Sequence, residues 1–167
     1  MSAVGDRAAA LRREFDAAFT EPARPLGVDG DDVLAIALAG GRYAIRTAEL
    51  AAVQACPPIT RLPGPVPALL GVVAVHGEVL PVYALAALLG LGPAAPARWI
   101  AITHRPAAVA LAFDGLDGQR RITPEALVAA PASGPLLDGV VAEPGGPRAM
   151  LSITRIVAAI AAREESP

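Results

Sequence analysis

The chain has 167 residues, a formal net charge of −2, 54% hydrophobic residues and only 4% aromatic ones. This length suits one domain, or two small lobes with a shared core, and it needs no disulfide or metal to fold. The lack of a dense Lys/Arg cluster and of stacking aromatics argues against nucleic acid as a partner. The single cysteine, Cys56, excludes an internal disulfide and agrees with a reducing cytoplasm.

No membrane segment is expected from the hydropathy pattern. The N-terminus lacks the basic start and apolar run of a signal peptide. The longest run without charge, Val79 to Ala97, is broken by Pro81, Gly90, Gly92, Pro93 and Pro96. A spanning helix needs about 20 mainly apolar residues without such breaks. We therefore expect a cytoplasmic protein with no direct membrane insertion.

The first 32 residues are predicted to form an appendage. Asp6 to Phe19 has helical period, with Ala8, Leu11, Phe15 and Phe19 on one stripe and charged residues facing away. Glu21 to Asp32 follows with Pro, Gly and acidic residues, a composition typical of a linker. The helix would then pack on the body of the protein or on a partner.

From Val33 the pattern changes to short apolar runs. Val33 to Leu38 and Tyr43 to Ile45 flank Ala39-Gly40-Gly41, which predicts a hairpin. Thr47 to Val53 is Ala-rich and fits either a helix or a strand. Pro57 to Pro67 holds five prolines (PPITRLPGPVP) and predicts an extended loop.

A second hairpin is predicted from Gly71 to Tyr83, in which Gly71 to Val75 and Glu78 to Tyr83 flank His76-Gly77. Gly77 supplies the positive φ of a tight turn. Pro81 lacks an N–H donor, so one side of its strand must be free or bulged there. A short helix is expected over Ala84 to Leu89.

The rest of the chain continues in short strands. Predicted strands cover Arg98 to Thr103, Ala107 to Phe113, Leu116 to Ile122, Leu136 to Ala142 and Arg148 to Ile153. A last helix, capped by Ser152 or Thr154, follows with an apolar face. Frequent turns between short strands indicate a mainly β fold, a small barrel or sandwich.

The sequence contains no recognisable motif for catalysis, for metal binding or for cofactor binding. No serine lies in a nucleophile elbow, and Cys56 lies in apolar surroundings that indicate packing. His76 and His104 lie at separate turns without the spacing of zinc ligands. Asp29, Asp31 and Asp32 lack the calcium-loop pattern. We therefore expect a binding protein without enzymatic activity and without cofactors.

The ordered motifs around the second hairpin resemble the CheW family. They comprise Tyr43-Ala44-Ile45, Ile59 to Pro63 (ITRLP), Gly71 to Val82 (GVVAVHGEVLPV), Phe113 to Leu116 (FDGL) and the closing strand Arg148 to Ile153 (RAMLSI). The family reads Y-x-I, I-x-x-L-P and K-G-x-x-N-L-R-G-x-x-x-P-V-x-D-L at this spacing. The resemblance covers about Val33 to Ile160.

This resemblance implies two small SH3-like five-stranded β-barrel lobes that share a hydrophobic seam, with an N-terminal and a C-terminal helix. It places the CheW-like domain at residues 33–162, followed by a tail at 163–167. It also implies a chemotaxis adaptor, or scaffold, for signal transduction by protein–protein interaction. Its partners would be the regulatory domain of a CheA-like histidine kinase and the chemoreceptor cytoplasmic tip, at membrane-associated receptor arrays.

Five residues are expected to lie on or near the partner surfaces: Leu50, Ala52, Val53, His76 and Gly77. Two of them depart from the family pattern, because His76 replaces an Arg that helps to contact partners and Ala52 replaces a Glu. The family's Asp after Pro-Val is Ala84 here. Arg offers a permanently charged fork that His lacks at neutral pH. These departures fit a divergent paralogue whose coupling to the kinase is altered. They also fit a compensating change, in which the family's Arg and Glu serve one contact and both have been lost together.

Two other classes of function remain open at this point. A small-ligand-binding or enzymatic β-barrel would need polar groups that converge in a pocket, for example around His76 and His104. A structural oligomerisation module would use the N-terminal helix, and deletion of the residues before Gly27 would then change the mass of the particle.

Overall fold

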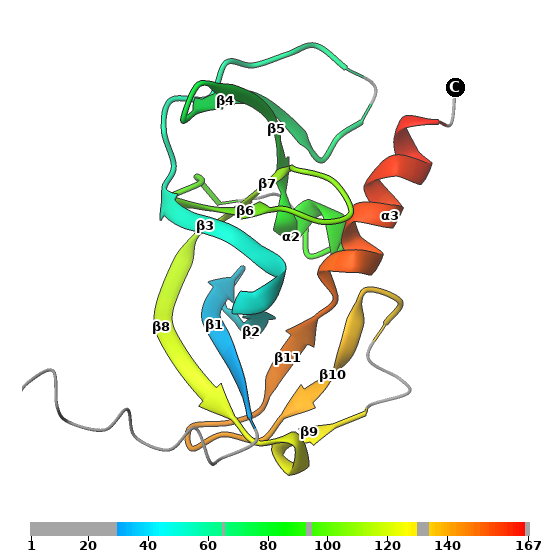
Figure 1. Cartoon of the computed structure of the whole chain (residues 1–167). Coiled ribbons are helices and arrows are strands. Elements are labelled where there is room, and N and C mark those ends of the chain that lie inside the picture. Colours follow the sequence, from blue (N-terminus) through cyan, green and yellow to red (C-terminus); the bar gives the residue numbers. More distant parts are fainter. Residues whose placement is uncertain (1–29, 65, 93–94, 130–133, 166–167) are drawn as a thin grey trace, which may run out of the picture.

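The computed structural model describes residues 30–64, 66–92, 95–129 and 134–165. These residues form two β-sheets and few helices (Figure 1). The predicted helix over Asp6 to Phe19 and nearly all of the predicted linker lie outside the described residues. The mainly β character expected from the short apolar runs is confirmed.

The first sheet, which we call the first lobe, has six strands in the order β8-β1-β2-β11-β10-β9. Their bounds are β1 (Asp31–Leu38), β2 (Gly41–Arg46), β8 (Gly115–Ile122), β9 (Leu127–Val128), β10 (Leu137–Val141) and β11 (Arg148–Leu151). β1 pairs with β2 and β8 in antiparallel fashion, and β2 pairs with β11 in parallel. The parallel pair brings together strands from opposite ends of the chain.

The second sheet, or second lobe, has five strands in the order β3-β6-β7-β5-β4. Their bounds are β3 (Leu50–Ala55), β4 (Leu69–Val75), β5 (Glu78–Ala84), β6 (Trp99–Thr103) and β7 (Ala110–Phe113). Two 3-10 turns, η1 (Thr47–Glu49) and η2 (Pro124–Ala126), and two helices, α2 (Leu85–Leu88) and α3 (Ile153–Glu164), complete the fold. The chain therefore leaves the first lobe after β2 and returns to it at β8.

Three apolar clusters organise the interior. One lies within the first lobe and includes Val33, Ala44 and Met150. A second lies within the second lobe and includes Val75 and Ile100. The largest joins the two lobes, and its buried members include Ile36, Ile45, Tyr83, Leu85, Leu111, Phe113, Leu151, Ile153 and Ile156. This third cluster, which we call the seam, contains the apolar face of α3 and confirms that the two sheets share a core.

The two predicted hairpins are present as the antiparallel pairs β1–β2 and β4–β5. The predicted strands that became β6, β7, β10 and β11 also pair in antiparallel fashion, as β6–β7 and β10–β11. The stretch from Thr47 to Val53, left open between helix and strand, is a 3-10 turn followed by β3. β1 begins at Asp31, earlier than predicted, because Asp31 pairs across to Ile122 and its carboxylate contacts Arg46. Ser152 is the N-cap residue of α3, yet its hydroxyl makes no capping hydrogen bond.

Closure of each sheet into a five-stranded barrel is not confirmed. Within the described residues the first strand order ends at β8 and β9, and the second ends at β3 and β4. The first lobe also has six strands, because the short β9 pairs with β10 along Val128 and Leu127. Beyond β4, one isolated bridge from Thr60 to Val72 ties part of the proline-rich loop to the second lobe.

Candidate partner-binding surfaces

The turn between β4 and β5 presents His76 and Gly77 to solvent. His76 has a φ of 50° and Gly77 a φ of 84°. Two successive residues with positive φ are characteristic of the tight turn whose twist matches that of a hairpin. Both residues are exposed, and no atom lies within 4 Å of a Cβ placed on Gly77. The turn is therefore accessible, and its contact with a partner stays a prediction.

An apolar cross-strand pair lies directly beside this turn. Ala74 on β4 faces Val79 on β5, and both are exposed, Val79 to 68%. The neighbours Val75 and Leu80 point into the interior of the second lobe. Sequence reasoning missed Val79 as a contact residue, although the alternation of Val79 outward and Leu80 inward would have indicated it. The turn and this pair form one surface, the hairpin tip.

The other three expected contact residues lie on β3. Leu50, Ala52 and Val53 are each half-buried. Leu50 and Val53 pack against the seam, whereas Ala52 packs against the interior cluster of the second lobe. β3 lies at one end of the strand order, with only β6 as its neighbour in the described sheet. The strand thus combines partly covered apolar side chains with a backbone edge.

A charged cluster borders β3 at its beginning. Arg46 contacts Asp138 and lies 3.1 Å from the Asp31 carboxylate, while Arg155 lies 3.9 Å from Asp138. Glu49 follows in η1, and its Oε2 atom is buried without a hydrogen-bond partner. Burial raises the pKa of the Glu49 carboxyl, against the charge of Arg46, which lowers it. The cluster is an electrostatic feature that the sequence did not reveal.

Cys56 packs rather than offering a nucleophile. Its side chain contacts the interior cluster of the second lobe, and burial raises the pKa of its thiol. A raised pKa lowers the fraction of reactive thiolate at neutral pH. Cys56 also lines a wide cavity of about 830 Å³ formed largely by the proline-rich loop and by residues 95–97. Neither His76 nor His104 lines this cavity.

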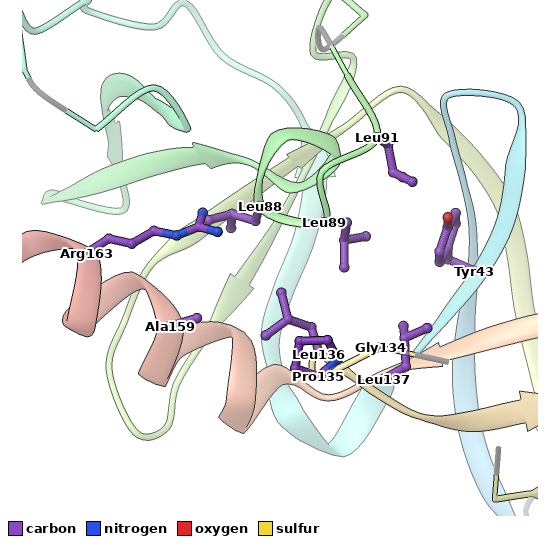
Figure 2. A pocket seen from close by; sticks show the side chains of 10 residues that line it. All are labelled: Tyr43, Leu88, Leu89, Leu91, Gly134, Pro135, Leu136, Leu137, Ala159 and Arg163. Carbon is purple, nitrogen blue, oxygen red and sulfur yellow. The ribbon is translucent and has the colours of Figure 1, made fainter. Parts of the chain in front are cut away.

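An apolar groove of about 370 Å³ opens where the two lobes meet α3. Figure 2 shows Leu89 and Leu91 on one side of it, Tyr43 from β2 on another, and Leu136 and Leu137 opposite. Ala159 and Arg163 contribute from α3. Tyr43 and Arg163 are the polar or charged side chains among its lining residues, and His76 and His104 are absent from it.

Two other kinds of feature are absent from the described part of the chain. No group of three or more His, Cys, Asp or Glu side chains there is arranged to hold a metal ion. No helix there is long and apolar enough to cross a membrane.

Comparison with known proteins identifies the family. The family model of the CheW-like domain matches residues 32–161, which include every described strand except the first residue of β1, and most of α3. The chain belongs to the CheW-like domain family. Among solved structures, the CheW-like fold is shared with the scaffolding protein TtCheW from Thermoanaerobacter tengcongensis, with a TM-score of 0.69. The identity is 16%, over 76% of this chain and 92% of that one. A search of curated proteins finds no match.

The three positions that depart from the CheW-like pattern, His76, Ala52 and Ala84, lie in different environments. His76 is exposed at the hairpin tip, whereas Ala52 is half-buried against the interior of the second lobe. Their strands, β4–β5 and β3, occupy opposite ends of the strand order. Ala84, at the position of the family's Asp, is 2% exposed and ends β5 beside α2. A charged side chain would therefore be solvated at position 76, partly buried at position 52 and buried at position 84.

Proposed function

We propose that this CheW-like protein is a non-enzymatic adaptor that couples chemoreceptors to a CheA-type histidine kinase. The observation that carries the proposal is the match of the family model across residues 32–161, which include both lobes and the seam between them. Both partners are proteins, so the adaptor would act by contact and not by chemistry.

Two surfaces of the second lobe are the best candidates for these contacts. The hairpin tip offers an exposed apolar pair, Ala74 and Val79, beside a tight turn. The β3 edge offers Leu50, Ala52 and Val53 on a strand whose outer edge pairs with no other strand of the described sheet, so a partner strand could pair there. Transient signalling interfaces of below about 1,200 Å² are small enough for surfaces of this size.

The direct test is a binding measurement with purified partners. The regulatory domain of the cognate kinase and a receptor cytoplasmic tip are each titrated by calorimetry against the full chain. Binding to both at concentrations up to about 100 μM is expected for a weak array contact. Failure to bind either partner at that concentration would overturn the adaptor proposal.

Substitutions at the hairpin tip locate the contact. Val79→Asp introduces a charge into an exposed apolar surface and is expected to weaken kinase or receptor binding about tenfold, or about 1.4 kcal/mol. Val128→Asp is the matched control, because Val128 is 60% exposed on β9 of the other lobe. Equal loss in both variants would contradict the hairpin tip as the contact surface.

The role of His76 follows from the same titration. His76→Arg restores a permanent charge at an exposed position, so tighter binding is expected, by about tenfold at low salt. The gain should shrink as salt is added, because the charge is exposed and screened. Unchanged affinity would contradict this prediction and would mean that this protein makes no charged contact at the hairpin tip.

A ligand-binding barrel is the alternative that the geometry favours less. The apolar groove has a volume in the range of small-molecule sites, which is about 300–1,000 Å³. Its polar lining is limited to Tyr43 and Arg163, and leucine side chains line most of the rest of it. Specific ligands need several convergent polar groups, so the groove is better suited to apolar side chains.

A further inference from the structure

The groove between the lobes leaves apolar surface uncovered. Leu89, Leu136 and Leu137 are only half-buried, and Leu91 is 37% exposed. Figure 2 shows these side chains arranged around one open space, with Tyr43 at its side. Half-buried leucines gathered around one open space can serve as a docking surface for an apolar segment. The β3 edge and the hairpin tip, the surfaces assigned above to partners, contribute no residue to the groove.

The N-terminal segment supplies side chains of the required kind. Its stripe of Ala8, Leu11, Phe15 and Phe19 holds two of the three phenylalanines of the chain. The third, Phe113, is already buried in the seam. An amphipathic helix is marginal by itself and gains stability mainly by burying its apolar face. Aromatic side chains each bury about 150–250 Å² and contribute most to such contacts.

The segment is tethered close enough to reach the groove. Tyr43, at the side of the groove, pairs with Ile36 of β1. Ile36 lies roughly 17 Å along the strand from Asp31, where β1 begins, at about 3.4 Å per residue. The residues between Phe19 and Asp31 can span up to about 36 Å at about 3.3 Å per residue. The linker is therefore about twice as long as the direct path.

Charge also favours this segment. Arg163 is the charged side chain among the groove's lining residues, and it lies on the last turn of α3. Glu14 and Asp16 flank Phe15 in the segment, so a helix with Phe15 in the groove carries carboxylates on either side of it. An exposed pair of this kind contributes little energy, but it would favour one orientation of the helix.

We propose that the segment from Asp6 to Phe19 docks as a helix in the groove between the lobes of its own chain. A tethered segment has an effective concentration in the millimolar range, so even a weak contact is occupied in cis. Docking would place a helix over the joint between the lobes, next to α3. This assignment does not depend on the proposed adaptor function.

Cysteine pairing in the full chain tests the docked position. In a Cys56→Ser background, Leu91→Cys is combined with Ala8→Cys or with Ala18→Cys, at the two ends of the stripe. At least one pair is expected to form an intramolecular disulfide about tenfold faster than control pairs with Val128→Cys, because docking raises the local concentration. Equal rates with Leu91→Cys and Val128→Cys would overturn the proposal, and so would disulfides between chains.

A second measurement avoids cysteines. Leucine methyl signals of Leu89 and Leu91 are compared between the full wild-type chain and a Leu11→Asp/Phe15→Asp variant. Shifts confined to the groove residues are expected, while the control Arg13→Asp on the opposite face should leave them unchanged. Unchanged groove signals in the double variant would overturn docking. A lower particle mass in that variant would also overturn it, because the segment would then act between chains.

Discussion

Two charged side chains, Arg148 of β11 and Glu49 of η1, are buried to different degrees and differ in their hydrogen bonds. Arg148 is 1% exposed, yet its guanidinium donates to the carbonyls of Ile36 and Tyr43 and to the carboxylates of Asp117 and Glu143. Glu49 keeps one buried carboxylate oxygen without a partner. Buried polar groups destabilise a fold mainly when they lack partners. Arg148 therefore ties four segments of the first lobe together, whereas Glu49 carries a cost.

That cost predicts a dependence of stability on pH. Burial raises the pKa of Glu49, so the folded protein binds a proton that the unfolded chain has already released. This contribution to stability is present at acid pH and is lost as the pH rises through the raised pKa. Glu49→Gln keeps the size and removes the charge. The variant is expected to be more stable than the wild type at pH 7.

Urea unfolding of both proteins between about pH 7 and about pH 4 measures this effect. The advantage of Glu49→Gln should shrink on acidification, because Glu49 of the wild type becomes neutral as well. Glu125→Gln, at an exposed position in η2, serves as the control and should change little. An advantage that grows toward low pH would contradict the assignment.

At the scale of elements, two glycines of β4–β5 serve different purposes. Gly71 has a φ of 143°, and a Cβ there would lie 2.1 Å from the carbonyl oxygen of Thr60. That approach allows the paired hydrogen bonds between Thr60 and Val72, both 2.9 Å long. Gly77 has a φ of 84° in open space. Gly71 thus needs both its conformation and its lack of a side chain, whereas Gly77 needs only its conformation.

Alanine at these two positions should therefore have unequal effects. Gly77→Ala is expected to cost roughly 1–2 kcal/mol, the penalty of a left-handed residue. Gly71→Ala should cost more, because its Cβ also pushes the proline-rich loop away from β4. Chemical denaturation of the two variants provides the comparison. A cost for Gly77→Ala equal to or above that of Gly71→Ala would be inconsistent with this view of the bridge.

On the scale of the whole molecule, the seam makes the two lobes one folding unit. Its buried residues come from β1, β2, β11 and α3 on one side and from the second lobe on the other. The order of the chain strengthens this coupling, because the strands of the second lobe are inserted between β2 and β8 of the first lobe. Neither lobe can lose the seam without exposing the apolar surface of both.

A substitution in α3 tests this coupling. Ile156→Ala removes a fully buried seam residue and is expected to cost about 2–5 kcal/mol. Fluorescence of Trp99 reports on the second lobe, and the methyl signal of Met150 reports on the first. The urea midpoints of the two unfolding transitions, followed by these two signals, should fall together. The control Thr154→Ala, at an exposed position, should change neither midpoint much. Separate shifts would show that the lobes unfold independently.

Much of the local structure could be predicted from the sequence. The hairpins around Ala39-Gly40 and His76-Gly77 follow from alternating residues and turn chemistry, which are local properties. The conformation of Thr47 to Val53 could not be predicted, since an Ala-rich stretch has no strong preference and its pairing with β6 decides it. Contact roles of the five expected site residues stay predictions. The exposure of Val79 could have been predicted from the alternation of outward and inward side chains along its strand. The burial of Glu49 could not.

The sequence by itself determined the mainly β class, the turns and the ordered motifs of the CheW-like family, because these depend on residues close together in the chain. Only the tertiary structure decided that β3 joins the second lobe and that β2 pairs with the distant β11. It also decided which side chains share the seam and where the groove opens. The physical reason is that sheet partners and buried contacts form between residues far apart in sequence, where local pattern carries no information.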